Sequence, residues 1–311
     1  MPAVLTLTLN PTIDSACEAE RVFPTHKIRT HGERYDPGGG GINVARVLAR
    51  LGERVEVIYL AGGSTGALLD ELLVDRGIER HRIPIRDHTR MSLTVYERAT
   101  GQEFRFVPEG PLVSEDEWQA ALDHCHAELS TRPGGWLVAS GSLPRGVPAD
   151  FFARLSRLLV PLGVRLVLDT SGEALVAALA EGGLYLVKPS HGEFEALVGR
   201  KLASPAEIGE AAMDFVRAGK AAHVAVTLGH EGAVLAHAGG VVIRPGAKVE
   251  VRSATGAGDS FVAGMVHGFL RGEDAPAAFG WGMAAGTAAV LSPGTGLCDP
   301  ADVRRLRAEM G

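Results

Sequence analysis

The sequence predicts an α/β fold in which a largely parallel sheet is flanked by helices. Short β-rich runs alternate with helical patterns along the chain, which is typical of strand–helix–strand units. With 311 residues, 46% of them hydrophobic, the chain can bury a large core. No linker, low-complexity segment or internal repeat interrupts it, so we expect residues 1–311 to form a single domain.

Six runs are expected to be strands because they are short and rich in β-branched and other apolar residues. In chain order they cover residues 4–9, 55–60, 136–140, 165–169, 185–188 and 224–228. Helices are expected where apolar residues recur at three- and four-residue spacing. Such patterns cover residues 115–128, 149–159, 205–218 and 299–310.

Two segments, residues 15–35 and 92–107, break this strand–helix rhythm. The second alternates apolar with polar residues on both sides of a hairpin expected at Gly101. The apolar positions are Leu93, Val95, Phe104 and Phe106. A separate sheet of so few strands is unstable with one apolar face bare, so we expect it to pair with a second copy of the chain.

Charge and cysteine usage favour a cytoplasmic protein. The formal net charge of −6 argues against a nucleic-acid partner. Cys17, Cys125 and Cys298 form no Cys-x-x-Cys pair and suit a reducing compartment. The N-terminus lacks a basic segment followed by an apolar run, and the Ala/Gly-rich residues 275–291 fall short of a membrane span, so no membrane partner is expected.

One glycine-rich motif places a carboxylate on the first turn of a helix. It reads Ala254-Thr255-Gly256-Ala257-Gly258-Asp259-Ser260, and an apolar stripe typical of a helix follows it. Glycines let the backbone approach a ligand, and the unpaired N–H groups of a first turn attract phosphate oxygens. Asp259 suits such a site if it takes a proton from a hydroxyl while the amides stabilise the phosphoryl group under attack. An ordinary first-turn aspartate is the alternative, and this motif alone does not separate the two.

A second glycine cluster precedes another amphipathic helix. Residues 37–46 read Pro-Gly-Gly-Gly-Gly-Ile-Asn-Val-Ala-Arg, and the helix is expected to stop at Gly52. Four successive glycines are entropically costly and have no evident use in a packed core. A close approach of the backbone to a ligand is therefore favoured over a flexible loop without function. Asn43, one turn inside the helix, would offer its amide to a sugar hydroxyl.

Three competing motifs carry little weight. The chain has no Gly-x-x-x-x-Gly-Lys-[Ser/Thr] sequence, which excludes a P-loop. Gly280-x-Gly282-x-x-Ala285 fits a loose dinucleotide pattern without a preceding strand, so close helix packing is favoured. His124-Cys125-His126 looks like a metal-binding cluster, but residues two apart on a helix point to nearly opposite sides, so this cluster is expected at the surface.

Taken together, the motifs resemble those of the PfkB (ribokinase-like) family of sugar kinases, in particular its branch of phosphofructokinases and tagatose-6-phosphate kinases. The matching segments run nearly end to end: residues 6–11 with Asp14, 38–46, 89–90, 140–144, 169–175, 187–189, 227–229 and 256–260. Most of the branch carries a lysine inside the first glycine cluster, where this chain has Gly40. That four-glycine form is similar to the minor bacterial 6-phosphofructokinases.

The resemblance implies a ribokinase-like three-layer fold with a small β-sheet lid, built from about residues 15–35 and 92–107, through which two subunits form a homodimer. It implies ATP-dependent phosphorylation of fructose 6-phosphate to fructose 1,6-bisphosphate. Phosphorylation of fructose 1-phosphate or tagatose 6-phosphate stays open, because the fructofuranose ring is nearly symmetric between its two CH₂OH arms and tagatose differs by one hydroxyl orientation. A sugar-phosphate-binding regulator without catalysis is a further alternative.

The resemblance also assigns roles to residues. Asp259 is the implied base, with the amides of Gly256, Ala257 and Gly258 as the anion hole. The sugar phosphate would contact Asp14, Gly38, Gly39, Gly40, Asn43 and Ser142, with its phosphate on Arg29, Arg90 and Arg105. The nucleotide positions are Lys27, Lys188, Ser190, Thr227, Gly229, Ser253, Thr255, Met283 and Thr287.

Two cations are implied in the same way. Glu193 would act on Mg²⁺ through water, and backbone carbonyls of one group of residues would bind K⁺. That group is Ser253, Thr255, Ala289, Ser292, Gly294 and Gly296. Family members usually carry Asn where this chain has Ser190, and a hydroxyl offers one donor where an amide offers two.

Overall fold

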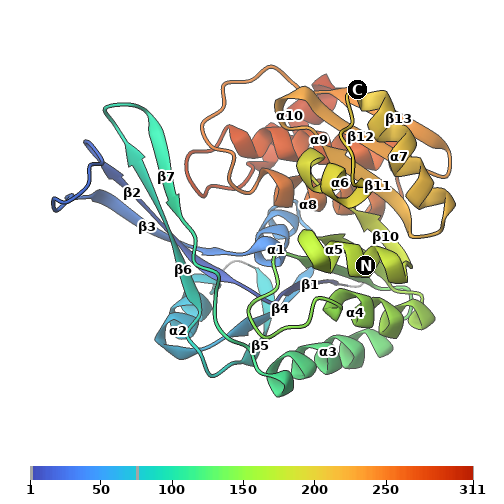
Figure 1. Cartoon of the computed structure of the whole chain (residues 1–311), viewed down its shortest axis with the longest axis horizontal. Coiled ribbons are helices and arrows are strands. Elements are labelled where there is room, and N and C mark those ends of the chain that lie inside the picture. Colours follow the sequence, from blue (N-terminus) through green and yellow to red (C-terminus); the bar gives the residue numbers. More distant parts are fainter. Residues whose placement is uncertain (1–2, 75–76, 311) are drawn as a thin grey trace.

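A nine-stranded sheet forms the middle layer of the computed structural model, which describes residues 3–74 and 77–310 (Figure 1). In spatial order the strands are β13 (Gly240–Pro245), β12 (Gly232–His237), β11 (Ala221–Thr227), β10 (Leu184–Val187), β9 (Arg165–Asp169), β8 (Trp136–Ser140), β1 (Val4–Thr8), β4 (Val55–Ala61) and β5 (Ile78–Pro84). Neighbouring strands from β11 to β5 are parallel, and β12 and β13 add an antiparallel edge.

Helices cover both faces of this sheet, because the central strands are apolar on both sides. One face carries α3 (Glu115–Ser130), α4 (Phe151–Leu159), α5 (Gly172–Glu181), α6 (His191–Val198) and α7 (Pro205–Arg217). The other carries α1 (Gly40–Arg50), α2 (Gly63–Leu72), α8 (Ala257–Leu270), α9 (Ala275–Val290) and α10 (Pro300–Glu309). Successive residues of β4 alternate between the two layers, with Val57 in one and Ile58 in the other. The predicted α/β architecture with three layers is confirmed.

Helices α8 and α9 pack closely because glycines on each remove the side chain that would separate them. A Cβ atom on Gly264 would lie 2.4 Å from the Trp281 carbonyl oxygen, and one on Gly282 would lie 2.6 Å from Met265 Cγ. The expectation that helix packing explains the Gly-x-Gly pattern is therefore confirmed for Gly282.

A second sheet of four strands projects from the body in the order β3-β2-β6-β7 and is called the lid sheet below (Figure 1). Its strands are β2 (Thr12–Ala19), β3 (His31–Gly38), β6 (Arg90–Glu97) and β7 (Gln102–Phe106). The pairing of Glu97 with Gln102 places the hairpin at Gly101, whose φ is 73°. Strand β2 begins at Thr12, three residues before the predicted segment 15–35, and β6 begins at Arg90, two residues before the predicted segment 92–107.

Several elements differ from the sequence-based expectation. Strand β11 begins at Ala221 rather than 224, because the small and polar residues at its start still pair with β10. The edge strand β5 was not expected, because it carries charged residues and His81 on its partly exposed positions. Strands β12 and β13 and helices α2, α5 and α6 were also not assigned in advance.

The described residues include no helix both long and apolar enough to cross a membrane. The three cysteines, Cys17, Cys125 and Cys298, are buried free thiols. Burial raises the pKa of the Cys125 thiol to about 12 and that of Cys298 to about 11. All three are therefore protonated near neutral pH and act as small apolar core residues.

Candidate active site

A cleft of about 300 Å³ opens at the carboxyl ends of β1, β8 and β9. The chain leaves β1 toward β4 and β5 on one side and later fills β8 to β13 on the other, so the boundary between β1 and β8 is a topological switch point. Open α/β sheets bind ligands at such points. The lining residues are Thr12, Asp14, Gly39, Gly40, Asn43, Ser92, Arg105, Val107, Ser140, Gly141, Ser142, Asp169, Thr170, Ser171, Glu193, Thr255, Gly256 and Asp259.

The first glycine cluster forms one wall and packs tightly against the body. A Cβ atom added to Gly38 would lie 2.1 Å from Asp14 Oδ2, and one added to Gly40 would lie 2.2 Å from Ser140 Oγ. A Cβ atom added to Gly41 would lie 2.4 Å from the Leu7 carbonyl oxygen. The expectation that these glycines have no use in packing is therefore wrong. They let the N-terminus of α1 reach the ends of β1 and β8, and Gly39 and Gly40 also line the cleft.

The second glycine cluster brings the N-terminus of α8 to the opposite wall. Gly256 is the N-cap residue with a φ of 73°, and its missing side chain leaves room for Leu297, 2.5 Å from a would-be Cβ. The first-turn amides have no acceptor within the helix. The Ala257 N–H makes only a long contact of 3.4 Å to the Ala254 carbonyl oxygen. Asp259 stands on this turn, at the cleft.

The carboxyl group of Asp259 titrates close to neutral pH. Its burial raises the pKa to about 6, and the nearby carboxylates of Asp169 and Asp14 add to that shift. A hydrogen bond from Asn43 and the charge of Lys188 oppose it. A carboxyl group with such a pKa is ionised at pH 7 and accepts a proton readily, which is the property of a general base.

Asn43 is oriented by a chain of buried hydrogen bonds. Its Nδ2 donates to Asp259 Oδ2 at 2.9 Å, and its Oδ1 accepts from Arg46 Nη1 at 3.2 Å. The Arg46 guanidinium also donates to the Pro37 carbonyl oxygen at 2.6 Å and to Asp36 Oδ1 at 3.2 Å. Because Arg46 can only donate, it fixes which end of the Asn43 amide faces Asp259. Sequence reasoning assigned Asn43 to the sugar and did not identify Arg46.

A buried ion pair closes the floor of the cleft. Lys188 Nζ lies 3.1 Å from Asp169 Oδ1, and both side chains are largely shielded from solvent. Burial alone would favour neutral lysine, but attraction to Asp169, Glu193 and Asp259 raises the Lys188 pKa, so the ammonium stays charged. Asp169 was not assigned a role from sequence. Its position at the end of the predicted strand 165–169 was the signal for it, because carboxyl ends of parallel strands carry binding residues.

The lid sheet supplies the remaining wall through alternate residues. Ser92 Oγ donates to Asp14 Oδ1, and Arg105 reaches the cleft from β7. Burial raises the pKa of Asp14, while the charges of Arg46, Arg105 and Arg90 oppose that rise. Ser92 was not identified from sequence, because an isolated serine in a strand carries no pattern.

Three predicted substrate-binding residues, Arg29, Gly38 and Arg90, and the predicted nucleotide residue Lys27 lie outside the lining of this cleft. Arg90 donates to the carbonyl oxygens of Pro108 at 2.8 Å and Asn10 at 2.9 Å. Arg29 and Lys27 are exposed in the loop between β2 and β3, at the tip of the lid sheet. Gly38 packs against Asp14 without lining the cleft.

The predicted nucleotide residues come from four neighbouring segments. Lys188 follows β10, Thr227 ends β11 with Gly229 just beyond it, and Ser190 pairs with Thr227 as an isolated bridge. Met283 and Thr287 lie one turn apart on α9, with Met283 buried. Ser253 and Thr255 precede α8, and only Thr255 of this group lines the cleft.

Ser190 is the N-cap of α6 and forms a reciprocal capping box. The Glu193 N–H donates to Ser190 Oγ at 3.4 Å, and the Ser190 N–H donates to Glu193 Oε2 at 2.7 Å. Asn and Ser cap helices about equally well, so the exchange of the family's Asn for Ser190 retains this local role. Glu193 is thereby held with its carboxylate on the cleft, and a carboxylate that keeps a free oxygen suits hydrated Mg²⁺.

The predicted K⁺ ligands are gathered by two adjoining segments. The Arg252 and Ser253 N–H groups both donate to the Val290 carbonyl oxygen, at 2.8 and 3.4 Å. In the loop that follows α9, Ser292 Oγ donates to the Leu297 carbonyl oxygen at 3.2 Å. The donor set is made of carbonyl and hydroxyl oxygens, which fits a hard monovalent cation.

Comparisons with known proteins agree with this geometry. The pfkB family carbohydrate kinase model matches residues 7–302. The ATP-dependent 6-phosphofructokinase isozyme 2 of Escherichia coli is 39% identical over 308 residues, covering 99% of each chain. The 1-phosphofructokinase of Xanthomonas campestris is 34% identical over 269 residues, covering 86% of this chain and 84% of the relative.

Solved structures of phosphofructokinase-2 from Escherichia coli are also similar. The structure in complex with potassium has a TM-score of 0.95, and the one in complex with fructose-6-phosphate has 0.93; both are 38% identical and cover 100% of this chain and 99% of the other. The fold is therefore that of the ribokinase-like α/β kinases. The chain belongs to the pfkB family of carbohydrate kinases, which makes it a phosphotransferase with an alcohol acceptor.

The Arg46 network predicts a selective loss of stability. Arg46→Lys should lower the free energy of unfolding by about 1.5–3 kcal/mol, because one ammonium cannot reproduce charge-assisted bonds to three acceptors in fixed directions. Urea denaturation measures this change. Arg50→Lys, one turn along α1 with a single bond to the Cys298 carbonyl oxygen, is the control and should change stability by less than about 1 kcal/mol. Equal losses in both variants would contradict the prediction.

Proposed function

We propose that this chain is an ATP-dependent 6-phosphofructokinase that converts fructose 6-phosphate to fructose 1,6-bisphosphate. The observation that carries the proposal is a buried carboxyl group of raised pKa, Asp259, on a helix N-terminus in the same cleft as the guanidinium of Arg105. A proton acceptor and a phosphate ligand in one cleft suit a substrate that carries a hydroxyl and a phosphate. The full-length similarity to a 6-phosphofructokinase supports this choice of substrate.

In the proposed reaction, Asp259 removes the proton from the free CH₂OH group of the sugar phosphate. The resulting oxygen forms a bond to the γ-phosphorus of ATP while the bond from that phosphorus to the β,γ-bridging oxygen breaks, and ADP leaves with the electron pair. The first-turn amides of Gly256, Ala257 and Gly258 stabilise the charge on the transferred group. Lys188 adds a fixed positive charge beside this site.

The walls of the cleft suit the sugar phosphate. Asp14 and Ser142, with the backbone of Gly39 and Gly40, offer polar groups for ring hydroxyls. Arg105 offers a bidentate fork for the phosphate already present. Arg90 supports this wall through its bonds to the chain and its charge near Asp14. Arg29, at the lid tip, is proposed to act on the substrate bound by a partner subunit.

The nucleotide would occupy the region bounded by Lys188, Ser190, Thr227 and Gly229, by Ser253 and Thr255, and by Met283 and Thr287, with Lys27 reaching it from a lid. We propose that Glu193 holds Mg²⁺ through water. The ion would neutralise phosphate charge when bound. We propose K⁺ near Ser253, Thr255, Ala289, Ser292, Gly294 and Gly296, where it would order the loop before α8.

A substrate panel tests the proposed function. Purified protein is assayed by coupled ADP release with fructose 6-phosphate, fructose 1-phosphate, tagatose 6-phosphate, ribose and adenosine. The expected result is the highest kcat/KM with fructose 6-phosphate. Highest activity with another sugar phosphate would replace the substrate, and no turnover with any of them would support a non-catalytic binding protein.

The phosphate wall predicts a change confined to one substrate. Arg105→Ala should raise KM for the sugar phosphate about 10–100-fold and leave KM for ATP within about threefold, because a charge-assisted contact contributes about 1.5–3 kcal/mol. Steady-state kinetics measure both constants. Arg98→Ala, an exposed lid arginine paired with Glu18, is the matched control and should change neither. A similar rise in both KM values for Arg105→Ala would mean that Arg105 only supports the fold.

The role of Asp259 predicts both a loss of rate and a pH profile. Asp259→Asn should lower kcat by about 10²–10⁴-fold while ATP still binds. In the wild-type protein kcat/KM should fall about tenfold per pH unit below pH 6, because protonation of a group with a pKa of about 6 removes the base.

Asn43→Ala should move that acidic limb to higher pH, because the Asn43 hydrogen bond lowers the pKa of Asp259. The profile of kcat/KM against pH measures the shift, and the exposed variant His126→Ala should reproduce the wild-type curve. An unchanged limb in Asn43→Ala, or more than a tenth of wild-type kcat in Asp259→Asn, would exclude Asp259 as the base.

We also propose a homodimer formed through the outer face of the lid sheet. The strand register places Tyr35, Ser15, Leu93 and Phe106 in one row across the four strands. Tyr35, Leu93 and Phe106 in that row are exposed, whereas Asp14 and Ser92 belong to the opposite face, at the cleft. A four-stranded sheet with an apolar face in water is unfavourable, and burying this apolar row against a second copy would stabilise it.

Light scattering should therefore report a dimer at micromolar concentration, and Leu93→Glu should convert it to a monomer. A charge placed in the centre of an apolar interface is costly to bury without a partner. Val176→Glu, at an exposed apolar residue of α5, is the control and should remain dimeric. A wild-type monomer with full activity would rule the interface out.

A further inference from the structure

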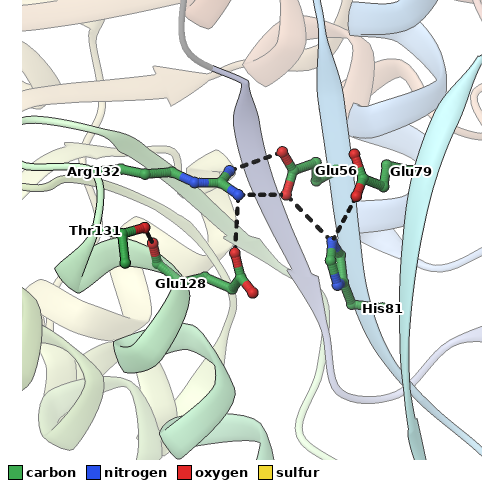
Figure 2. Close-up of polar contacts among 6 residues, drawn as sticks. All are labelled: Glu56, Glu79, His81, Glu128, Thr131 and Arg132. Carbon is green, nitrogen blue, oxygen red and sulfur yellow. Dashed lines mark hydrogen bonds and ion pairs between the residues drawn. The ribbon is translucent and has the colours of Figure 1, made fainter.

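A polar cluster lies at the edge of the main sheet, where α3 packs over β4 and β5. It contains Glu56 of β4, Glu79 and His81 of β5, and Glu128 of α3, with Arg132 just beyond the helix (Figure 2). His124 of α3 stands beside them, with its ring 5.1 Å from that of His81. None of these residues lines the active-site cleft, so the proposed kinase activity does not account for them.

The fold brings two imidazoles and a carboxylate together. His124 and Glu128 are four residues apart on α3, one above the other on one face of the helix. His81 faces them from β5, where residues of the same parity as Glu79 point toward α3. A ring nitrogen of His81, a ring nitrogen of His124 and a carboxylate oxygen of Glu128 all lie within 4.8 Å of one another. Sequence reasoning placed His124 at the surface, because it compared His124 only with His126.

His124 carries a nitrogen that its surroundings leave unsatisfied. Its Nε2 atom is shielded from solvent and has no hydrogen-bond partner among the described residues. Buried polar atoms without a partner are rare in folded proteins and indicate a missing ligand, water or ion.

Carboxylates around the cluster hold these groups in place. His81 Nε2 lies 3.3 Å from Glu56 Oε2, and Glu56 accepts two hydrogen bonds from Arg132, at 2.8 and 3.0 Å. Arg132 also donates to Glu128 Oε2 at 2.9 Å, which leaves the other oxygen of Glu128 on the side of His81 (Figure 2). Metal-binding histidines usually have such a carboxylate partner, which fixes the orientation of the ring.

We propose that His81, His124 and Glu128 form a zinc site. Two imidazole nitrogens and a carboxylate oxygen are a donor set that Zn²⁺ prefers, with a fourth position left for water, whereas Mg²⁺ and K⁺ take oxygen ligands. Bonds of about 2.0–2.1 Å at tetrahedral angles place the donor atoms about 3.4 Å apart. Small side-chain rotations of these partly exposed residues bring the donors to that spacing.

The bound ion would connect α3 to the edge strand of the main sheet. It lies on the outside of β4 and β5, away from the cleft, so it stabilises this end of the sheet and takes no part in phosphoryl transfer. Because the ion binds the folded chain, its binding raises the melting temperature.

The experiment uses the full chain without a histidine tag, stripped of metal with chelator and free of nucleotide. Calorimetric titration with zinc sulfate should give one equivalent bound per chain at this site, and the melting temperature should rise. A tenfold excess of Mg²⁺ should not displace the zinc. Co²⁺ in place of zinc should give the visible absorption of a tetrahedral site.

Variants assign the bound ion to these residues. His124→Ala should abolish this binding event, and Glu128→Gln, which keeps the size of the side chain, should weaken it at least about tenfold. His126→Ala, on the same helix but exposed, should bind zinc as the wild-type chain does. A wild-type chain that binds no zinc, or a His124→Ala chain with unchanged stoichiometry and affinity, would overturn the proposal.

Discussion

The hydrogen bond from Asn43 to Asp259 is the contact on which the site depends, because it joins the N-termini of α1 and α8 across the cleft. Each helix is brought there by glycines that allow close backbone contact, Gly38 to Gly41 for α1 and Gly256 for α8. Arg46 then fixes the Asn43 amide, and Asp36 connects Arg46 to Thr295 Oγ1 at 2.7 Å. Asp259, the root of the lid sheet and the loop before α10 therefore share one buried network. A buried network of this kind is stable only when all its members are satisfied.

Charge balance is the second constraint on the cleft. The carboxylates of Asp169 and Asp14 raise the pKa of Asp259, and the charge of Lys188 opposes that rise. The charge of Arg105 lowers the pKa of Asp14 in the same way. The raised pKa of Asp259 is a direct result of this crowding together with burial. Under the proposed reaction, a phosphorylated sugar and ATP would bring further negative charge, which Arg105, Lys188 and bound cations would offset. The same low-dielectric surroundings strengthen each of these interactions once water is excluded.

Local patterns predicted much of the fold because central parallel strands are buried on both faces and appear as short apolar runs. Edge strand β5 was not predicted because most of its residues, including His81, are polar and only partly buried, so it does not appear as an apolar run. The glycine motifs located Asp259, Asn43 and the first-turn amides, but not what holds them. Asn43 and Asp259 are 216 residues apart in sequence, and no local spacing encodes that pairing. Asp169, Ser92 and Arg46 were missed for the same reason, since each matters only through partners brought in by the tertiary fold. The exchange at Ser190 appeared as a departure in sequence, and the capping box shows it to be a retained helix cap.

The lid sheet presents polar cleft residues on one face and an apolar row on the other, with Ser92 and Leu93 adjacent in the chain. Both surfaces belong to the same strands, so an interaction that orders the strands at one surface also orders them at the other. Under the proposed dimer, sugar-phosphate binding and subunit association are linked equilibria: free energy that the ligand contributes to ordering β6 and β7 also strengthens association, and dimerisation returns the same factor to ligand affinity. Subunit concentration would then act as a determinant of substrate affinity, without any separate regulatory site.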